Sequence, residues 1–170
     1  ETVMKITEKI KQSRIYIDGG MGTMLQQAGL GPGENSAHWN LTHPDEIITI
    51  HKAYLSAGCD CICANTFGIN PLNEDRWEEL TKAALSCAKQ AVSNFLGTYV
   101  AFDMGPTGKM LQPLGDLSFD GAAQSFSKLA SLAETCGADV IFIETMSDCY
   151  ETKAAVVGAK EGCSLPIFEK

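Results

Sequence analysis

The sequence is poor in positive charge and has no long apolar run. Its 13 Lys and Arg residues stand against 21 Asp and Glu residues, so the formal net charge is −8, and Lys and Arg never cluster. Because affinity for nucleic acid rests mainly on neutralised phosphates, this balance argues against a nucleic-acid partner. No apolar stretch approaches the roughly 20 residues that span a bilayer, and no signal-type apolar core follows the N-terminal basic residues. We therefore expect a cytoplasmic protein without a membrane partner.

Several common catalytic motifs are also missing. The glycine-rich segments 19–23 and 104–108 lack the Gly-Lys-Ser/Thr of a P-loop and the Gly-x-Gly-x-x-Gly spacing of a dinucleotide site, so the sequence gives no support for phosphate binding. No nucleophile elbow, Ser-His-Asp order or His-Glu-x-x-His occurs. Of the three histidines, we interpret His43 and His51 as non-catalytic, with His51 on the outer side of a helix, and leave His38 undecided.

The length and composition predict one globular domain with a sizeable core. The 170 residues are 45% hydrophobic, which excludes wholesale disorder. The seven cysteines are an odd number and fall mostly inside apolar runs. Cys59, Cys61 and Cys63 alternate, which in a strand places all three on one face, where they could form a metal or redox site. We interpret them instead as small buried residues of a reduced compartment.

Short apolar runs alternate with longer helical patterns along the chain. The predicted strands are residues 14–18, 60–65, 99–103, 139–144 and the start of a fifth at 166–168. The predicted helices begin near Thr42, Asn73, Ser118 and Ser147 and end near Gly58, Gly97, Cys136 and Gly162. Near-continuous apolar strands separated by helices are typical of a parallel sheet that is covered on both faces. The fold class is therefore α/β.

An internal repeat favours a barrel over an open sheet. Residues 58–66 align without gaps on residues 137–145, across what would be strands 2 and 4. In a (β/α)₈ barrel, alternate strands contribute to the same interior layers and so share an environment. A doubly wound open sheet has the same alternation of elements but gives those strands no equivalent surroundings.

Four predicted strands end in a polar residue, namely Asp18, Asn65, Asp103 and Glu144. The ends of parallel strands lie on one edge of the sheet, where α/β enzymes build their active sites. The glycine-rich segment 19–23 would add bare N–H groups that can hold an anion. Carboxylates for a cation and amides for an anion suit a zwitterion such as an amino acid.

These residues resemble the homocysteine S-methyltransferase family, most closely the N-terminal homocysteine-binding barrel of its cobalamin-dependent members. The matching segments are DGGMGTMLQ at 18–26, HP at 43–44, NTFG at 65–68, DMGPTG at 103–108 and ETMSD at 144–148. The resemblance implies a (β/α)₈ barrel that binds homocysteine at its rim, with zinc on the thiolate. It also implies that Asp18 and Glu144 hold the ammonium group, and that Gly19, Asn65 and Thr66 surround the carboxylate.

The resemblance departs from the family in the metal site. The family's zinc ligands are cysteines on strands 6 and 8, and none of the seven cysteines here matches those positions. We therefore expect residues 1–170 to be the N-terminal half of the barrel, its first four βα units and the start of strand 5. This half would carry no catalytic or metal-binding residue, would be inactive alone, and would self-associate or pair with the C-terminal half-barrel. Cobalamin or methyltetrahydrofolate would be bound by other modules, and the sequence does not identify the methyl donor.

Two other functions remain open at this point. One is a divalent-metal lyase or aldolase barrel that uses Asp18, Asp103 and Glu144 as oxygen ligands. The other is a non-catalytic half-barrel that binds an amino acid or mediates dimerisation.

Overall fold

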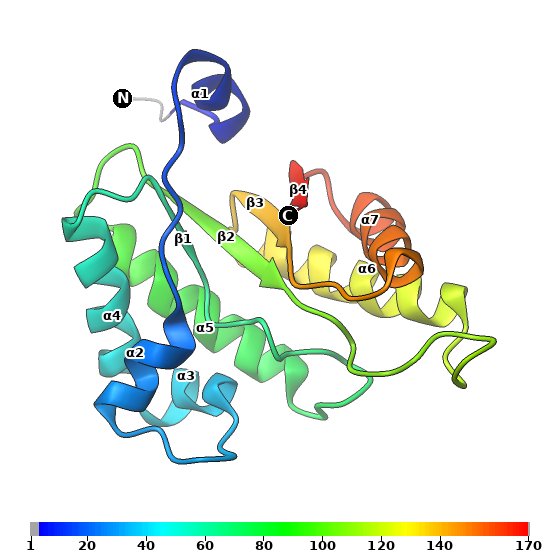
Figure 1. Ribbon diagram of the computed structural model, residues 1–170. Coiled ribbons are helices and arrows are strands. Elements are labelled where there is room, and N and C mark those ends of the chain that lie inside the picture. Colours follow the sequence, from blue (N-terminus) through cyan, green and yellow to red (C-terminus); the bar gives the residue numbers. More distant parts are fainter. Residues whose placement is uncertain (1–3, 170) are drawn as a thin grey trace.

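The computed structural model describes residues 4–169, and its centre is a single parallel sheet. The strands are β1 (Cys61–Cys63), β2 (Tyr99–Met104), β3 (Val140–Ile143) and β4 (Ile167–Glu169). They pair in chain order, β1-β2-β3-β4, as Figure 1 shows. A doubly wound sheet would reverse its strand order at a switch point. The predicted α/β class is confirmed, and the consecutive order is that of a barrel segment.

The first predicted strand is shorter in the structure than in the sequence prediction. Residues 14–18 run beside β1 but form only one parallel bridge, between Ile17 and Cys61. The backbone N–H of Asp60 donates to the carbonyl of Tyr16 at 2.7 Å, and that of Asp18 donates to the carbonyl of Cys61 at 3.0 Å. These bonds place the segment next in the sheet order, so the carboxyl of Asp18 still lies at the sheet's edge.

Four long helices follow the strands as predicted. They are α4 (Pro44–Ser56), α5 (Trp77–Val92), α6 (Phe119–Thr135) and α7 (Cys149–Gly162). Ser118 caps α6 as predicted, accepting from the N–H of Gly121 at 3.0 Å. Within residues 4–169, no helix is both long and apolar enough to cross a membrane.

α4 and α7 begin within two residues of their predicted starts and α5 begins four residues later than predicted, but the residues predicted to start these three helices do not cap them. Asn73 does not open α5: its amide donates to the carbonyl of Thr107 at 3.1 Å and ties two loops together. Thr42 does not cap α4, since its hydroxyl donates to the carbonyl of His38 at 3.2 Å. Asp148, rather than its neighbour Ser147, caps α7 by accepting from the N–H of Tyr150 at 2.8 Å.

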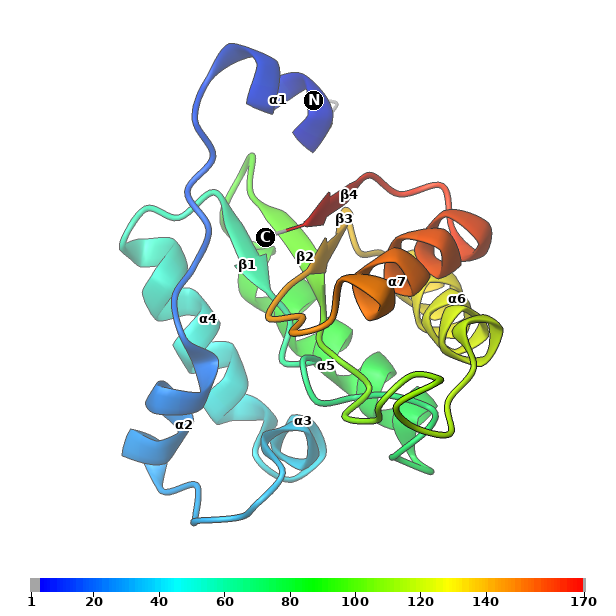
Figure 2. The same cartoon turned by 45° about the vertical axis from the view of Figure 1, so that its right-hand side comes forward.

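Short helices that the sequence analysis did not predict lie at the two ends of the sheet. They are α1 (Ile6–Gln12), α2 (Met21–Ala28), the 3₁₀ turn η1 (Ser36–His38) and α3 (Trp39–Thr42). Figures 1 and 2 show α1 at one end and α2 and α3 at the other. Ile6 of α1 is buried against the sheet, and Lys9 pairs with Asp60 at 2.5 Å. This end of the sheet is thereby covered.

The two faces of the sheet pack against different partners. Alternate residues such as Val100 and Ile141 join the core under α5, α6 and α7, and Figure 2 shows these helices gathered on that side. The residues between them, including Ala101 and Phe142, form a second, inner cluster. Because side chains alternate along a strand, Asp103 and Glu144, two residues beyond Ala101 and Phe142, share this inner face.

Two sequence interpretations fail in this packing. His51 is fully buried rather than on the outer side of its helix, because it lies on the face of α4 that packs against neighbouring elements, which include α2, α3, α5 and β1. The three alternating cysteines are not on one face: Cys61 and Cys63 join the inner cluster, while Cys59 packs with the outer one. Cys59 precedes β1, so strand alternation does not extend to it.

Candidate functional site

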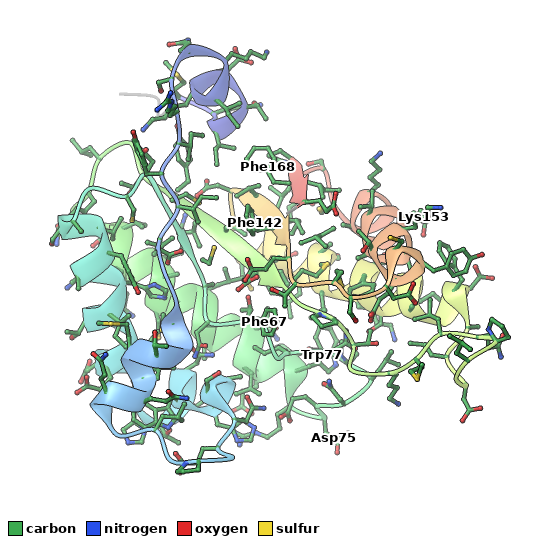
Figure 3. All side chains as sticks on the ribbon, in the orientation of Figure 1. Phe67, Asp75, Trp77, Phe142, Lys153 and Phe168 are labelled. Carbon is green, nitrogen blue, oxygen red and sulfur yellow. The ribbon has the colours of Figure 1, made fainter. Side chains whose placement is uncertain are left out.

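The predicted strand-end residues meet around one cavity. A cavity of about 520 Å³ is lined by Asp18, Asn65, Asp103 and Glu144. Phe67 and Phe142, labelled in Figure 3, also line the cavity. Phe142 pairs in register with Phe168 of β4, the third aromatic residue labelled in this region. The edge predicted from the sequence is therefore a real concave site.

The carboxyl of Asp18 is strongly perturbed by its position in this site. Burial raises its pKa from 3.8 to about 6, and the nearby charge of Glu144 acts in the same direction. The backbone N–H of Cys63 donates to Oδ2 of Asp18 at 3.0 Å and partly offsets this effect. A cationic ligand would relieve the unfavourable burial of the Asp18 carboxylate and its repulsion by the charge of Glu144. The site is thus suited to an ammonium group.

The glycine-rich loop that follows Asp18 supplies backbone donors to the same cavity. Gly19, Gly20, Met21 and Gly22 all line it, and Gly20 is the N-cap of α2. The first N–H groups of a helix have no partner within the helix and attract anions. Tyr54 supports the loop by donating its hydroxyl to the carbonyl of Gly20 at 3.2 Å.

Gly19 lets the ring of Tyr54 approach the backbone closely, and a larger residue at this position would displace that ring. A Cβ at residue 19 would lie 2.9 Å from the hydroxyl oxygen of Tyr54. The sequence analysis did not identify Tyr54, which lies in the middle of a helical pattern with nothing to mark it. Only the packing of α4 beside the loop reveals its role.

Asn65 lines the cavity, and its side-chain amide is already bonded to neighbouring residues. Nδ2 of Asn65 donates to the carbonyl of Ser36 at 2.8 Å and to Oδ1 of Asn40 at 3.2 Å. Both amide hydrogens are thus engaged. Ser36 also lines the cavity, although no sequence motif marks it.

Thr66 is the one predicted site residue that does not line the cavity. It is fully buried, and its hydroxyl both donates to the carbonyl of Asp103 at 2.8 Å and accepts from the N–H of Asp103 at 3.0 Å. These two bonds join the segment after β1 to β2. In this structure Thr66 fixes the position of Asp103 and presents no side-chain donor to a ligand.

The backbone next to Glu144 is strained. Thr145 has a φ of 59°, in the left-handed region, and lines the cavity. A β-branched residue is uncommon in this conformation, which costs on the order of 1–3 kcal/mol. Such strain persists where the surrounding structure fixes it, and here it shapes the backbone at the end of β3.

The described residues do not fit a zinc site. Within residues 4–169, no group of three or more His, Cys, Asp or Glu side chains is arranged to hold a metal ion. Burial raises the pKa of the Cys61 thiol to about 12 and raises that of Cys63 further. Thiols with these pKa values stay protonated at neutral pH, whereas zinc binds the thiolate.

None of the three histidines lines the cavity. Nε2 of His38 lies 2.9 Å from Oε2 of Glu74, and this bond lowers the pKa of the Glu74 carboxyl. His43 stacks on Trp39 with ring centroids 4.1 Å apart. These contacts give His38 and His43 structural roles.

Comparison with known proteins points in the same direction as the site. A family model described as homocysteine S-methyltransferase matches residues 15–169. Methionine synthases of Mycobacterium tuberculosis and Mycobacterium leprae are 34% and 32% identical, over 96% of this chain but only 15% of their own length.

Among solved structures, the homocysteine methyltransferase MmuM of Escherichia coli has the same fold. Its oxidised form matches with a TM-score of 0.72 and 19% identity, over 95% of this chain and 63% of MmuM. Its apo form matches with a TM-score of 0.73 and 24% identity, over 93% of this chain and 59% of MmuM. The chain therefore spans about three fifths of that structure. The family match over nearly all of its residues, with the strand-end residues gathered at one cavity, means that the chain belongs to the homocysteine S-methyltransferase family.

Proposed function

We propose that this chain supplies the amino-acid-binding half of a homocysteine site in a methyltransferase of the methionine synthase type. The observation that carries the proposal is that one cavity is lined both by the acidic residues Asp18 and Glu144 and by residues 19–22, which lead into the N-terminus of α2. An α-amino acid carries both an ammonium and a carboxylate, so it matches a site that offers carboxylates and backbone N–H groups together. Family membership supports homocysteine as that amino acid.

The proposed binding mode follows from these groups. Asp18 and Glu144 hold the ammonium, and the start of α2 at Gly20 holds the carboxylate. Phe67 and Phe142 provide apolar surface for the methylene groups of the side chain. The thiol then points away from the glycine-rich loop, toward the part of the site where a methyl donor must arrive.

In this proposal, the zinc ion that activates the homocysteine thiol is bound by another part of the protein. The described residues offer no zinc site, and this chain matches only 15% of the length of the methionine synthases. We propose that the metal ligands belong to a C-terminal half-barrel and that a methyl donor such as methylcobalamin or methyltetrahydrofolate binds to further modules. The isolated chain would then purify without stoichiometric zinc and form no methionine.

Binding can be tested by NMR on the ¹⁵N-labelled chain, with L-homocysteine added under reducing conditions. We expect saturable shifts at the amides of Gly19, Gly20 and Gly22, with millimolar affinity. Each charge-assisted bond contributes about 1.5–3 kcal/mol, and the cost of association is of comparable size. Glu144→Gln should weaken binding roughly tenfold, since it keeps an acceptor oxygen but removes the negative charge that strengthens this bond.

Glu161→Gln is the matched control, because Glu161 is exposed on α7 and does not line the cavity. It should leave homocysteine affinity unchanged. Shifts confined to residues outside the cavity, or equal losses in the two variants, would contradict the proposal. One zinc per chain together with micromolar homocysteine affinity would contradict the assignment of the metal to another half.

The lyase alternative has lost its support. It required Asp18, Asp103 and Glu144 to share a divalent cation, and the described residues contain no such group. Family membership favours transfer of a methyl group instead.

A further inference from the structure

Asn40 and Asn65 form a buried pair of amides beside the cavity. Asn40 lies on α3 and is 2% exposed, while Asn65 follows β1 and is 6% exposed. Nδ2 of Asn40 donates to the backbone carbonyl of Asn65 at 2.9 Å. In return, Oδ1 of Asn40 accepts from Nδ2 of Asn65 at 3.2 Å. Of these two asparagines, Asn65 lines the cavity and Asn40 does not.

Two backbone carbonyls fix the orientation of both amides. A carbonyl oxygen only accepts hydrogen bonds, so the group that faces it must be the NH₂ of the amide. The backbone carbonyl of Asn65 therefore fixes the position of Nδ2 of Asn40. The oxygen Oδ1 of Asn40 then faces the side-chain amide of Asn65. The backbone carbonyl of Ser36 fixes the position of Nδ2 of Asn65 in the same way.

In this orientation, the side chain of Asn65 has only a hydrogen-bond acceptor available for a ligand. Both hydrogens of its amide are used by Ser36 and Asn40, so the side chain can offer a ligand only its oxygen, which accepts hydrogen bonds. A carboxylate also only accepts hydrogen bonds, so the two cannot bind each other. An ammonium group has three donors and can bind Asn65 together with Asp18 and Glu144.

We propose that Asn40 is a positioning residue that holds the side-chain oxygen of Asn65 toward the ammonium group of the substrate. Asn65 is then an ammonium ligand rather than a carboxylate ligand, and the carboxylate depends on the N–H groups of residues 19–22. The inference rests on the proposed function. It changes the role that family resemblance implied for Asn65 and adds Asn40, which the sequence analysis did not identify.

Two truncated analogues of homocysteine test binding of its ammonium group and of its carboxylate separately. 3-Aminopropane-1-thiol keeps the ammonium and lacks the carboxylate, whereas 4-mercaptobutanoate keeps the carboxylate and lacks the ammonium. We expect Asn40→Ala and Asn65→Ala to weaken binding of the amine by roughly tenfold to a hundredfold, the range of one hydrogen bond to a charged group. Binding of the acid should stay unchanged in both variants.

Asn94→Ala is the matched control. Asn94 is exposed in the turn after α5 and does not line the cavity. It should leave both affinities as they are. Thermal unfolding of each variant shows that any loss of binding occurs in a folded protein.

A readout without ligand tests the orientation directly. In the wild type, the side-chain NH₂ protons of Asn65 should exchange slowly with solvent, and in Asn40→Ala they should exchange faster. Rapid exchange in the wild type would overturn the inference, as would a selective loss of the acid in Asn65→Ala. If the wild type binds neither fragment nor homocysteine, the proposed function fails even where the exchange result confirms the amide pair.

Discussion

Asp18 and His51 are buried titratable residues whose pKa values shift in opposite directions. Burial raises the pKa of the Asp18 carboxyl from 3.8 to about 6 and lowers that of the His51 imidazole from 6.5 to about 4. Both shifts mean that the folded state disfavours the charged form. Between about pH 4 and 6.5, rising pH therefore lowers the stability of the folded state through Asp18 and raises it through His51.

Asp18→Asn should stabilise the protein near neutral pH while abolishing ammonium binding. The native carboxyl holds a proton up to about pH 6, whereas the unfolded one loses it near 3.8, so stability falls as pH rises through this window. Removing the charge should recover about 1–3 kcal/mol, because Asn still accepts from Cys63. Urea unfolding measures the gain, which should vanish below about pH 4. A destabilised Asp18→Asn variant at neutral pH would contradict this account.

His51→Leu should remove the opposite dependence. His51 is fully buried, and within residues 4–169 neither ring nitrogen has a hydrogen-bond partner. Because the unfolded imidazole takes up a proton below 6.5 and the folded one only near 4, the wild type loses stability as pH falls through this range. The variant should be more stable than the wild type by about 2–3 kcal/mol near the acid end. Chemical denaturation at several pH values checks this, and parallel profiles for both proteins would refute it.

At the scale of elements, α6 and α7 approach each other closely through two glycines. A Cβ at Gly158 would lie 2.2 Å from the carbonyl oxygen of Ala123, and one at Gly162 would lie 2.2 Å from that of Ser127. No side chain fits in such a space without moving a backbone. The small residues on α7 thus set how far α7 stands from α6 and hence where Glu144, between β3 and α7, reaches the site.

Gly158→Ala should destabilise the protein by about 1–3 kcal/mol, because α7 has to move away from α6. Gly22→Ala is the matched control: it is also a glycine within a helix, but nothing lies within 4 Å of its added Cβ. That substitution should stabilise by about 0.5–1 kcal/mol through helix propensity. Urea midpoints of the two variants should therefore shift in opposite directions, and shifts of the same sign would mean that α7 can move freely.

At the scale of the whole molecule, the sheet ends in two edges. β4 pairs with β3, and residues 14–18 pair with β1 through one bridge. Tyr16 and Ile17 on the latter edge are 61% and 41% exposed. Unpaired edges beside exposed apolar side chains attract further strands. A C-terminal half-barrel would cover both edges in the proposed function.

The isolated chain should accordingly self-associate at micromolar concentration, as seen by light scattering. Tyr16→Lys places a charge on the edge and should shift the population toward monomer. Leu96→Lys is the control, since Leu96 is 91% exposed in the turn before β2, away from the edge. A wild-type monomer that binds no hydrophobic dye would contradict the prediction.

The sequence by itself determined the order of the elements and the polar edge. Val140 to Ile143 is apolar throughout, so it had to be a strand covered on both faces, and Glu144 had to follow at its end. The same reasoning placed Asp18, Asn65 and Asp103 on one edge, where the structure confirms a common cavity. Such features are readable because they depend on the period of a strand and on the chemistry of single residues.

Only the tertiary structure decided what surrounds each side chain. The burial of His51 depends on four elements that pack around α4, and the hydroxyl of Thr66 turns to Asp103 because β2 lies beside it. The amide of Asn65 is set by Ser36 and Asn40, residues far from it in sequence. Hydrogen-bond direction and burial depend on neighbours that are brought together by folding, so no local pattern in the chain encodes them.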